Sequence, residues 1–286
     1  MIAAILTSGC ATTGAGYRVA DITASEHYFK KEFVKTDLCT LTVFHNFTRP
    51  NTQLTVYIEG DGMAWRSRRE LSEDPTPRHP LVLSLAIMDP SENTAYLARP
   101  GQLTLLAKPD CDPAYWSGKR FSMEVISAMN SAVDHLKSES RSKEVNLIGY
   151  SGGAIIAVMM AAQRNDVASL RTISGNLDPE TVNLYHGVAP MDGLPDPIDH
   201  SVKIGPIPQR HFAAENDRVI PFYITRSFAE KAGDKEGESI TVVKGTTHYF
   251  GWQKAWPSLL DLPLYKIDRA KRQVEKNQKE TVLSTF

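Results

Sequence analysis

The sequence has no run of about 18 to 20 consecutive apolar residues, the length that a membrane-spanning helix requires. It also has no excess of positive charge, because 32 Lys and Arg residues stand against 33 Asp and Glu residues. A formal net charge of -1 lacks the basic surplus that is typical of nucleic-acid-binding proteins, so we expect no nucleic-acid partner. With 42% hydrophobic residues, the 286-residue chain is long enough for one domain with a sizeable core.

Cysteine is scarce, with only three in the chain, at positions 10, 39 and 111. Their spacing matches no zinc-binding pattern and no His-Glu-x-x-His segment occurs, so we expect neither a metal ion nor another cofactor. Two alternatives stay open for Cys39 and Cys111. They form a disulfide if the protein is exported, because disulfides persist outside the cytoplasm, or they remain two free thiols.

The first ten residues combine a short apolar run, small side chains and Cys10. They resemble the end of a bacterial lipoprotein signal, in which the cysteine is lipidated after cleavage, although Thr7 stands where Leu, Val or Ile is usual. The run is shorter than the usual core of about 7 to 15 residues and no Lys or Arg precedes it, as a start codon upstream of Met1 would explain. We therefore expect either a periplasmic or cell-envelope lipoprotein anchored to a membrane through Cys10, or a cytoplasmic protein with an irregular N-terminal segment.

Strand-like and helix-like segments alternate along the chain, which predicts an α/β fold with a mainly parallel sheet flanked by helices. We expect residues 1–37 to form the signal-like segment and tether, and residues 38–286 to form a single domain. Predicted strands lie at 38–44, 53–58, 94–98, 144–148, 170–173, 211–214 and 239–243, and predicted helices at 122–138, 154–162 and 222–232.

The segments between these elements also carry predictions. Turn-forming residues at 46–51 separate the first two predicted strands, and we expect these strands to pair as a hairpin. Residues 66–80 are rich in charge and proline, which predicts a surface loop near the functional site. Residues 176–208 contain six prolines and little apolar periodicity, which favours an excursion from the sheet. The charged residues 267–280 predict a helix that is exposed to solvent.

The sequence Gly-Tyr-Ser-Gly-Gly, with Ser151 at its centre, lies between the predicted strand 144–148 and the predicted helix 154–162. It matches the G-x-S-x-G pattern, whose glycines allow a tight, strained turn that exposes the serine hydroxyl. A serine hydroxyl is a weak nucleophile and needs a base, a residue that orients the base, and hydrogen-bond donors for the oxyanion. The alternative is a strand-to-helix loop in which Ser151 only caps the helix.

A histidine and an aspartate follow the last two predicted strands. His248 comes directly after the last strand, and Asp217 follows the strand before it in the sequence Asp-Arg-Val-Ile-Pro. Each residue has a simpler alternative, because His248 could be a solvated loop residue and Asp217 a residue at a helix N-terminus. Glu215 and Asp178 are the substitutes if Asp217 does not orient the histidine.

These residues together resemble the α/β-hydrolase superfamily, in which nucleophile, acid and base occur in the order of Ser151, Asp217 and His248. The resemblance implies a Ser-His-Asp catalytic triad. It also implies an oxyanion hole that combines the N–H after the nucleophile with an N–H from the loop after an earlier strand. The sequence Glu-Gly-Asp-Gly at 59–62 is similar to that loop, with Glu59 in place of the usual histidine; the alternative is an ordinary Asp-Gly turn. The implied oxyanion-hole residues are Gly60, Asp61, Gly62 and Gly152, with the N–H of Asp61 as the second donor.

Within this superfamily, residues 38–260 resemble a group of poorly characterised bacterial hydrolases that are often exported. The similarity lies in the two motifs above, in Ala-Trp-Arg-Ser-Arg-Arg at 64–69 and in Tyr-Trp at 115–116. We expect a serine hydrolase that cleaves a carboxylic ester, or a related acyl bond, of a small-molecule substrate through an acyl-enzyme. The alternatives are a peptidase or amidase with the same triad, and a noncatalytic, envelope-tethered binding protein of this fold.

Two other clusters have open interpretations. Arg66, Arg68 and Arg69 either recognise an anionic group of the substrate or are solvated. The tryptophan-containing residues 252–256 either line an acyl pocket or pack a terminal helix, and we expect His211, within an apolar strand, to lie in the core.

Overall fold

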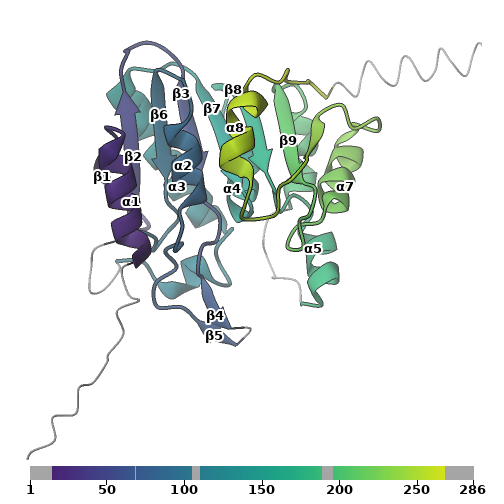
Figure 1. The fold of residues 1–286 in the computed structure, drawn as a ribbon, viewed down its shortest axis with the longest axis horizontal. Helices are drawn as coiled ribbons and strands as arrows, with labels where there is room; N and C mark the ends of the chain where they lie inside the picture. Colours follow the sequence, from purple (N-terminus) through teal and green to yellow (C-terminus); the bar gives the residue numbers. More distant parts are fainter. Residues whose placement is uncertain (1–14, 68, 105–109, 189–195, 268–286) are drawn as a thin grey trace, which may run out of the picture.

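The computed structural model describes residues 15–67, 69–104, 110–188 and 196–267. An eight-stranded sheet forms its centre, with the strand order β1-β2-β6-β3-β7-β8-β9-β10 (Figure 1). All pairs from β6 across to β10 are parallel, whereas β2 pairs antiparallel with both β1 and β6, so the sheet is mainly parallel. The strands are β1 Lys30–Lys35, β2 Thr40–Phe47, β3 Leu54–Ile58, β6 Asn93–Leu97, β7 Val145–Tyr150, β8 Val167–Ile173, β9 Gln209–Ala214 and β10 Ile240–Val243.

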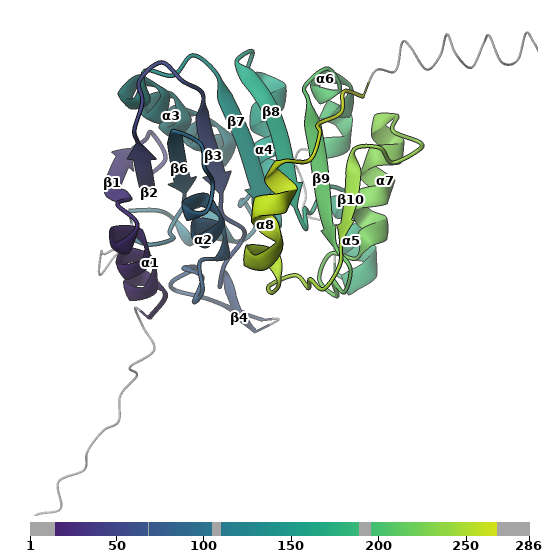
Figure 2. The same cartoon turned by 45° about the horizontal axis from the view of Figure 1, so that its top comes forward.

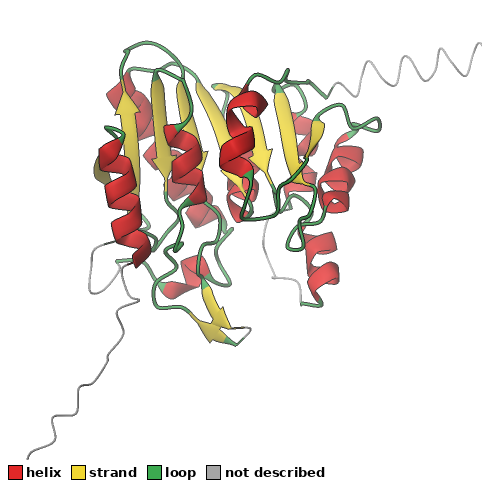
Figure 3. Ribbon diagram, in the orientation of Figure 1, coloured by secondary structure: helices red, strands yellow, loops and turns green. Residues whose placement is uncertain are grey.

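Helices cover both faces of the sheet, so the domain has three layers (Figure 3). Successive side chains of β3 point to opposite faces, as in any strand. Val56 and Ile58 therefore share a core with α3 and α4, while Tyr57 shares a core with α1, α2 and α8. Helices α1, α2 and α8 lie on the near face of the sheet in Figure 2. The helices are α1 Ala15–Glu26, α2 Leu81–Ile87, α3 Met123–Ser140, α4 Gly152–Gln163, α5 Pro179–His186, α6 Ser201–Ile204, α7 Phe222–Ala232 and α8 Trp252–Leu260, with the 3-10 helices η1 Pro113–Trp116 and η2 Pro197–His200.

The domain begins before residue 38, which corrects the predicted boundary between tether and domain. β1 pairs with β2 over its whole length, and Ala20 and Ala24 of α1 lie in the core that α2 also contributes to. The sequence of β1, Lys-Lys-Glu-Phe-Val-Lys, gives little strand signal because four of its six residues are charged, and Val34 is its one buried residue. Charged side chains suit an edge strand, since they discourage pairing with other chains.

The predicted hairpin between the first two strands is wrong. β2 forms its hairpin with β1, and β6 lies between β2 and β3 in the sheet. All five residues of β3 are buried, and such a strand belongs between two parallel neighbours, here β6 and β7, where both of its faces are covered.

The predicted surface loop at 66–80 instead begins with a small two-stranded sheet, β4 Trp65–Ser67 and β5 Glu70–Leu71, which projects at the lower edge of the molecule in Figure 1. The predicted excursion at 176–208 carries α5, η2 and α6 in its described part, and β8 and β9 on either side of it pair directly. Cys10, Arg68 and most of the predicted C-terminal helix at 267–280 lie outside the described residues.

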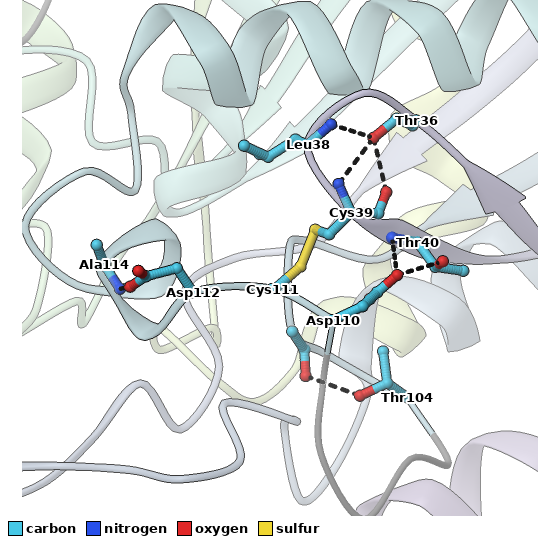
Figure 4. Close-up of a disulfide and its surroundings, with 10 residues drawn as sticks. Thr36, Leu38, Cys39, Thr40, Thr104, Asp110, Cys111, Asp112 and Ala114 are labelled. Carbon is cyan, nitrogen blue, oxygen red and sulfur yellow. Dashed lines mark hydrogen bonds between the residues drawn. A yellow bond between two sulfur atoms is a disulfide. The ribbon is translucent and has the colours of Figure 1, made fainter.

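Cys39 and Cys111 form a disulfide, which decides between the two alternatives left open by the sequence (Figure 4). It joins the residue before β2 to the segment that leads into η1. Beside it, Asp110 Oδ2 accepts hydrogen bonds from N and Oγ1 of Thr40 at 2.9 and 2.6 Å. Among the described residues, Cys39, Asp110 and Cys111 are the only group with metal-ligand spacing, and the disulfide engages both of its sulfur atoms. None of the helices in the described ranges has both the length and the apolar character needed to cross a membrane.

Candidate active site

Ser151 lies in a sharp turn between β7 and α4. Its φ of 52° is in the left-handed region, where a residue with a side chain is strained. The adjoining glycines are required by space: an added Cβ at Gly149 would lie 2.4 Å from the carbonyl oxygen of Gly153, and one at Gly153 would lie 2.4 Å from that of Glu59. Ser151 occupies the N-cap position of α4, but its side chain makes no capping hydrogen bond. The alternative in which Ser151 only caps the helix is therefore not supported.

Ser151, His248 and Asp217 form a continuous chain of hydrogen bonds. His248 Nε2 lies 3.1 Å from Ser151 Oγ, and His248 Nδ1 lies 2.9 Å from Asp217 Oδ2. The three residues follow β7, β10 and β9, and the carboxyl ends of these parallel strands meet at one edge of the sheet. The structure therefore brings together the three residues that the sequence singles out as nucleophile, base and acid.

The Asp217 carboxylate is buried and has fixed hydrogen-bond partners. Its Oδ1 accepts from the backbone N–H groups of Val219 and Ile220, both at 2.8 Å, so its Oδ2 is left for His248. Burial raises the pKa of Asp217, but the hydrogen bond and charge of His248 and the N–H of Ile220 outweigh burial, and the pKa ends below its usual value. An ionised Asp217 accepts a hydrogen bond from the Nδ1–H of His248, which leaves the lone pair of Nε2 facing the Ser151 hydroxyl.

The backbone of His248 is anchored on its other side. The hydroxyl of Tyr150, which precedes Ser151, donates to the carbonyl oxygen of His248 at 2.9 Å, and the indole N–H of Trp252 donates to the same oxygen at 3.2 Å. His248 is only 4% exposed, so its imidazole is shielded from bulk water. The position of His248 is therefore set from two sides, by Tyr150 at the end of β7 and by Trp252 at the start of α8.

The two substitute acids have structural partners instead of His248. Asp178 Oδ2 accepts hydrogen bonds from Ser227 Oγ at 2.5 Å and Lys231 Nζ at 2.8 Å, which holds α5 against α7. Glu215 Oε2 accepts from the backbone N–H of Gly245 at 2.9 Å, across the loops that follow β9 and β10. Asp217 is the carboxylate that the fold presents to the imidazole.

The predicted oxyanion loop, residues 59–62, follows β3 and lies beside the turn at 149–153 that carries Ser151, called the nucleophile turn below after its predicted role. An added Cβ at Gly60 would lie 3.2 Å from Ser151 Cβ, and one at Gly152 would lie 2.1 Å from Asp61 Oδ1. Gly62 has a φ of 61°, and an added Cβ there would lie 2.2 Å from the carbonyl oxygen of Pro75. Gly152 is the first residue of α4, so its N–H has no acceptor within the helix. The two predicted sources of oxyanion donors thus lie side by side, with no room for a side chain at Gly60 or Gly152.

Sequence reasoning missed the groups that surround this loop. Asp61 is paired through Oδ1 with Arg99 Nη1 at 3.2 Å and through Oδ2 with Arg120 Nε at 3.0 Å. Glu59, noted in the sequence only as a replacement for histidine, is buried and accepts hydrogen bonds from the N–H of Gly60 at 2.9 Å and the hydroxyl of Tyr96 at 3.1 Å. Tyr96 belongs to β6 and Arg99 follows it, and β6 adjoins β3 in the sheet, so only the strand order could have indicated these two partners. Arg120 lies between η1 and α3.

Three further predictions concern residues near the site. Trp252 and Trp256 are fully buried, which favours helix packing over an acyl pocket, and His211 is fully buried as expected, with Nδ1 2.9 Å from Thr172 Oγ1. Arg66 lies on the exposed β4 within 3.6 Å of Glu70 and belongs to the solvated alternative.

A scan against protein-family models and a search of curated protein sequences find no match to the chain. Solved structures do resemble it. Est1E from Butyrivibrio proteoclasticus has a TM-score of 0.54 at 13% identity, over 80% of this chain and 97% of that one. The esterase Pf2001 from Pyrococcus furiosus has a TM-score of 0.57 at 13% identity, over 82% and 90% of the two chains. An acylaminoacyl peptidase from Pyrococcus horikoshii has a TM-score of 0.58 at 13% identity, over 85% of this chain but 43% of that one. The mainly parallel sheet, its two helical layers and these likenesses show that the chain has the α/β-hydrolase fold.

Proposed function

We propose that this protein is a serine hydrolase that cleaves a carboxylic ester, or a related acyl bond, through an acyl-enzyme. The main support is the hydrogen-bonded chain from Ser151 Oγ through His248 to Asp217. Such a chain activates a hydroxyl that would otherwise be a weak nucleophile. The strained turn at Ser151 gives a second, independent support, because strain of this kind persists where a side chain must be presented in one position.

In the proposed reaction, Ser151 Oγ forms a bond to the carbonyl carbon while its proton passes to His248 Nε2. The carbonyl oxygen becomes an oxyanion, which accepts hydrogen bonds from the backbone N–H groups of Gly152 and Asp61. The leaving group departs with the proton from Nε2 and the acyl group stays on Ser151. A water molecule then attacks the acyl-enzyme, with His248 again taking the proton, and the carboxylic acid is released. Asp217 stabilises the imidazolium at each step.

Esters are the proposed substrate class because an ester carbonyl is less stabilised by resonance than an amide carbonyl, and its oxygen leaving group is expelled more easily than the nitrogen of an amide. Two of the similar structures are esterases, which agrees with this choice. Amide hydrolysis is the second candidate, favoured by the similarity to an acylaminoacyl peptidase. A noncatalytic binding protein of this fold is the alternative without chemistry. Hydrolysis of p-nitrophenyl esters of graded acyl length, compared with aminoacyl p-nitroanilides, distinguishes the three.

A fluorophosphonate probe tests the nucleophile directly. We expect the probe to label the wild-type protein and a Ser131→Ala control, in which an exposed helical serine is removed, but not Ser151→Ala. Mass spectrometry of the labelled peptide identifies the site, and circular dichroism checks that Ser151→Ala is folded. Labelling of Ser151→Ala at the wild-type rate would place the nucleophile elsewhere. A wild-type protein that neither reacts with the probe nor cleaves any ester or amide would leave the binding-protein alternative.

We also propose that the protein is exported and anchored to a membrane by lipidation of Cys10. The disulfide supports export, because disulfides form and persist in oxidising compartments. Mass spectrometry of the mature N-terminus from the native host tests the anchor. A diacylglyceryl group on Cys10 is expected, and a chain that retains an unmodified Met1 would rule it out.

A further inference from the structure

A buried glutamine links the oxyanion loop to the turn after β6. Gln102 is 1% exposed, its Nε2 donates to the carbonyl oxygen of Gly60 at 2.9 Å, and its Oε1 accepts from the backbone N–H of Arg99 at 3.0 Å. The amide has only one workable orientation. Rotation by 180° would place its oxygen against the Gly60 oxygen and its NH2 group against the Arg99 N–H. The carbonyl of Gly60 is thus held by a side chain that cannot itself change partners.

The direction of the Gly60 carbonyl determines the direction of the Asp61 N–H. Both groups belong to one planar trans peptide, in which C=O and N–H point to opposite sides of the chain. Because the oxygen is turned to Gln102, the N–H is turned away from Gln102. The two residues of this peptide lie beside the turn at Ser151, because a Cβ added at Gly60 would lie 3.2 Å from Ser151 Cβ and one added at Gly152 would lie 2.1 Å from Asp61 Oδ1.

Other contacts prevent the peptide from rotating. The Asp61 carboxylate is held by Arg99 and Arg120, and Arg99 is 3% exposed. On the far side, the N–H of Met63 donates to the carbonyl oxygen of Pro75 at 2.9 Å. Gln102 reinforces the first of these restraints, since it bonds to the backbone of Arg99 as well as to that of Gly60.

We propose that Gln102 is a positioning residue that sets the direction of the Asp61 N–H in the oxyanion hole. This role of Gln102 rests on the proposed function, and it adds a residue that belongs neither to the triad nor to the oxyanion loop. A donor that is aimed at the position of the oxyanion, and not at that of the substrate's carbonyl oxygen, stabilises the transition state more than the bound substrate. Loss of the Gln102 bond should therefore lower kcat and leave KM almost unchanged.

The first test is Gln102→Met, which keeps the length of the side chain and removes its donor. We expect kcat for the best ester to fall about 10- to 100-fold, with KM within about twofold of wild type. The affinity for a trifluoromethyl ketone, which forms an oxyanion on the serine, should fall by a similar factor. Gln163→Met, at an exposed position, is the matched control and should keep wild-type kcat. Thermal unfolding establishes that each variant is folded.

The second test is Gln102→Glu, which keeps an acceptor for Arg99 and donates to Gly60 only when its carboxyl group is protonated. Its kcat relative to wild type at the same pH should rise as the pH falls, whereas the ratio for Gln102→Met should stay constant. Folded variants with wild-type kcat and inhibitor affinity, or with a raised KM alone, would overturn the role of Gln102. A wild-type protein with no activity and no labelling of Ser151 would instead refute the proposed function.

Discussion

Glu59 is a carboxyl group buried within the oxyanion loop, where its charge state depends on pH. Burial raises its pKa to about 7, against the lowering effects of the Gly60 N–H, the Tyr96 hydroxyl and the charge of Arg99. Below about pH 4.5 the carboxyl group is protonated in both the folded and the unfolded chain, so it has no effect on the pH dependence of stability. Between pH 4.5 and 7 only the unfolded chain ionises, and the free energy of unfolding falls as the pH rises.

We expect Glu59→Gln to remove this pH dependence. The free energy of unfolding of the variant, minus that of wild type, should increase from pH 4.5 to pH 7 by an amount on the order of 3 kcal/mol. Urea denaturation at a series of pH values measures it. Glu26→Gln, at an exposed position on α1, is the control and should not show the trend. Parallel stability curves for Glu59→Gln and wild type would contradict the prediction.

The strand, turn and helix around Ser151 depend on close approach of two backbones. A Cβ at Gly153 would lie 2.4 Å from the carbonyl oxygen of Glu59 and 2.5 Å from that of Ile58, so α4 begins in direct contact with the end of β3. Backbone atoms cannot move aside as a flexible side chain can. The same contact sets the distance between the nucleophile turn and the oxyanion loop, which makes the first turn of α4 part of the site.

Gly153→Ala should therefore weaken both the fold and the reaction. We expect a loss of about 1 to 3 kcal/mol in the free energy of unfolding, typical of overpacking, together with slower fluorophosphonate labelling of Ser151. Gly118→Ala is the matched control, because an added Cβ there meets no atom within 4 Å, and it should change stability by less than about 0.5 kcal/mol. Equal effects of the two substitutions would show that the contact with β3 is unimportant.

At the scale of the whole molecule, the disulfide joins parts of the chain that are far apart in sequence. Cys39 and Cys111 are 72 residues apart, and the loop that they close includes β2, β3, β6 and the oxyanion loop. The segment after Cys111 leads through η1 to Arg120, which contacts Asp61. The covalent bond therefore connects the edge of the sheet with the surroundings of the site.

Removal of the disulfide should destabilise the fold without removing the triad. For a closed loop of this length, the chain-entropy relation gives a loss of about 4 kcal/mol. We expect the double variant Cys39→Ala, Cys111→Ala to show such a loss in urea denaturation, and the reduced wild-type protein to match it. Labelling of Ser151 should persist under conditions where the variant is folded. If reduction leaves the denaturation midpoint of wild type unchanged, the disulfide does not contribute as predicted.

The features that could be predicted from the sequence are those set by neighbouring residues. The turn at Ser151 was recognisable because its glycines, the apolar strand before it and the helix after it lie within about 20 residues. Asp217 and His248 could be assigned because they follow predicted strands in the chain order that the resemblance to the α/β-hydrolase superfamily implies, and parallel strands bring their carboxyl ends to one edge. The alternation of strand-like and helix-like segments predicted the fold class, and the chain order of Ser151, Asp217 and His248 predicted three residues that the structure brings together.

Only the tertiary structure decided which distant groups meet. β1 joined the sheet although its charged sequence resembles a tether, and β6 entered between β2 and β3 because a fully buried strand needs neighbours on both sides. That strand order carries Gln102 and Arg99 to the oxyanion loop. The bonds of Glu59, the partners of Asp61 and the pairing of Cys39 with Cys111 depend on the same long-range packing. Local sequence determines where a turn can form, whereas strand order, which results from burying the whole apolar surface at once, determines what surrounds it.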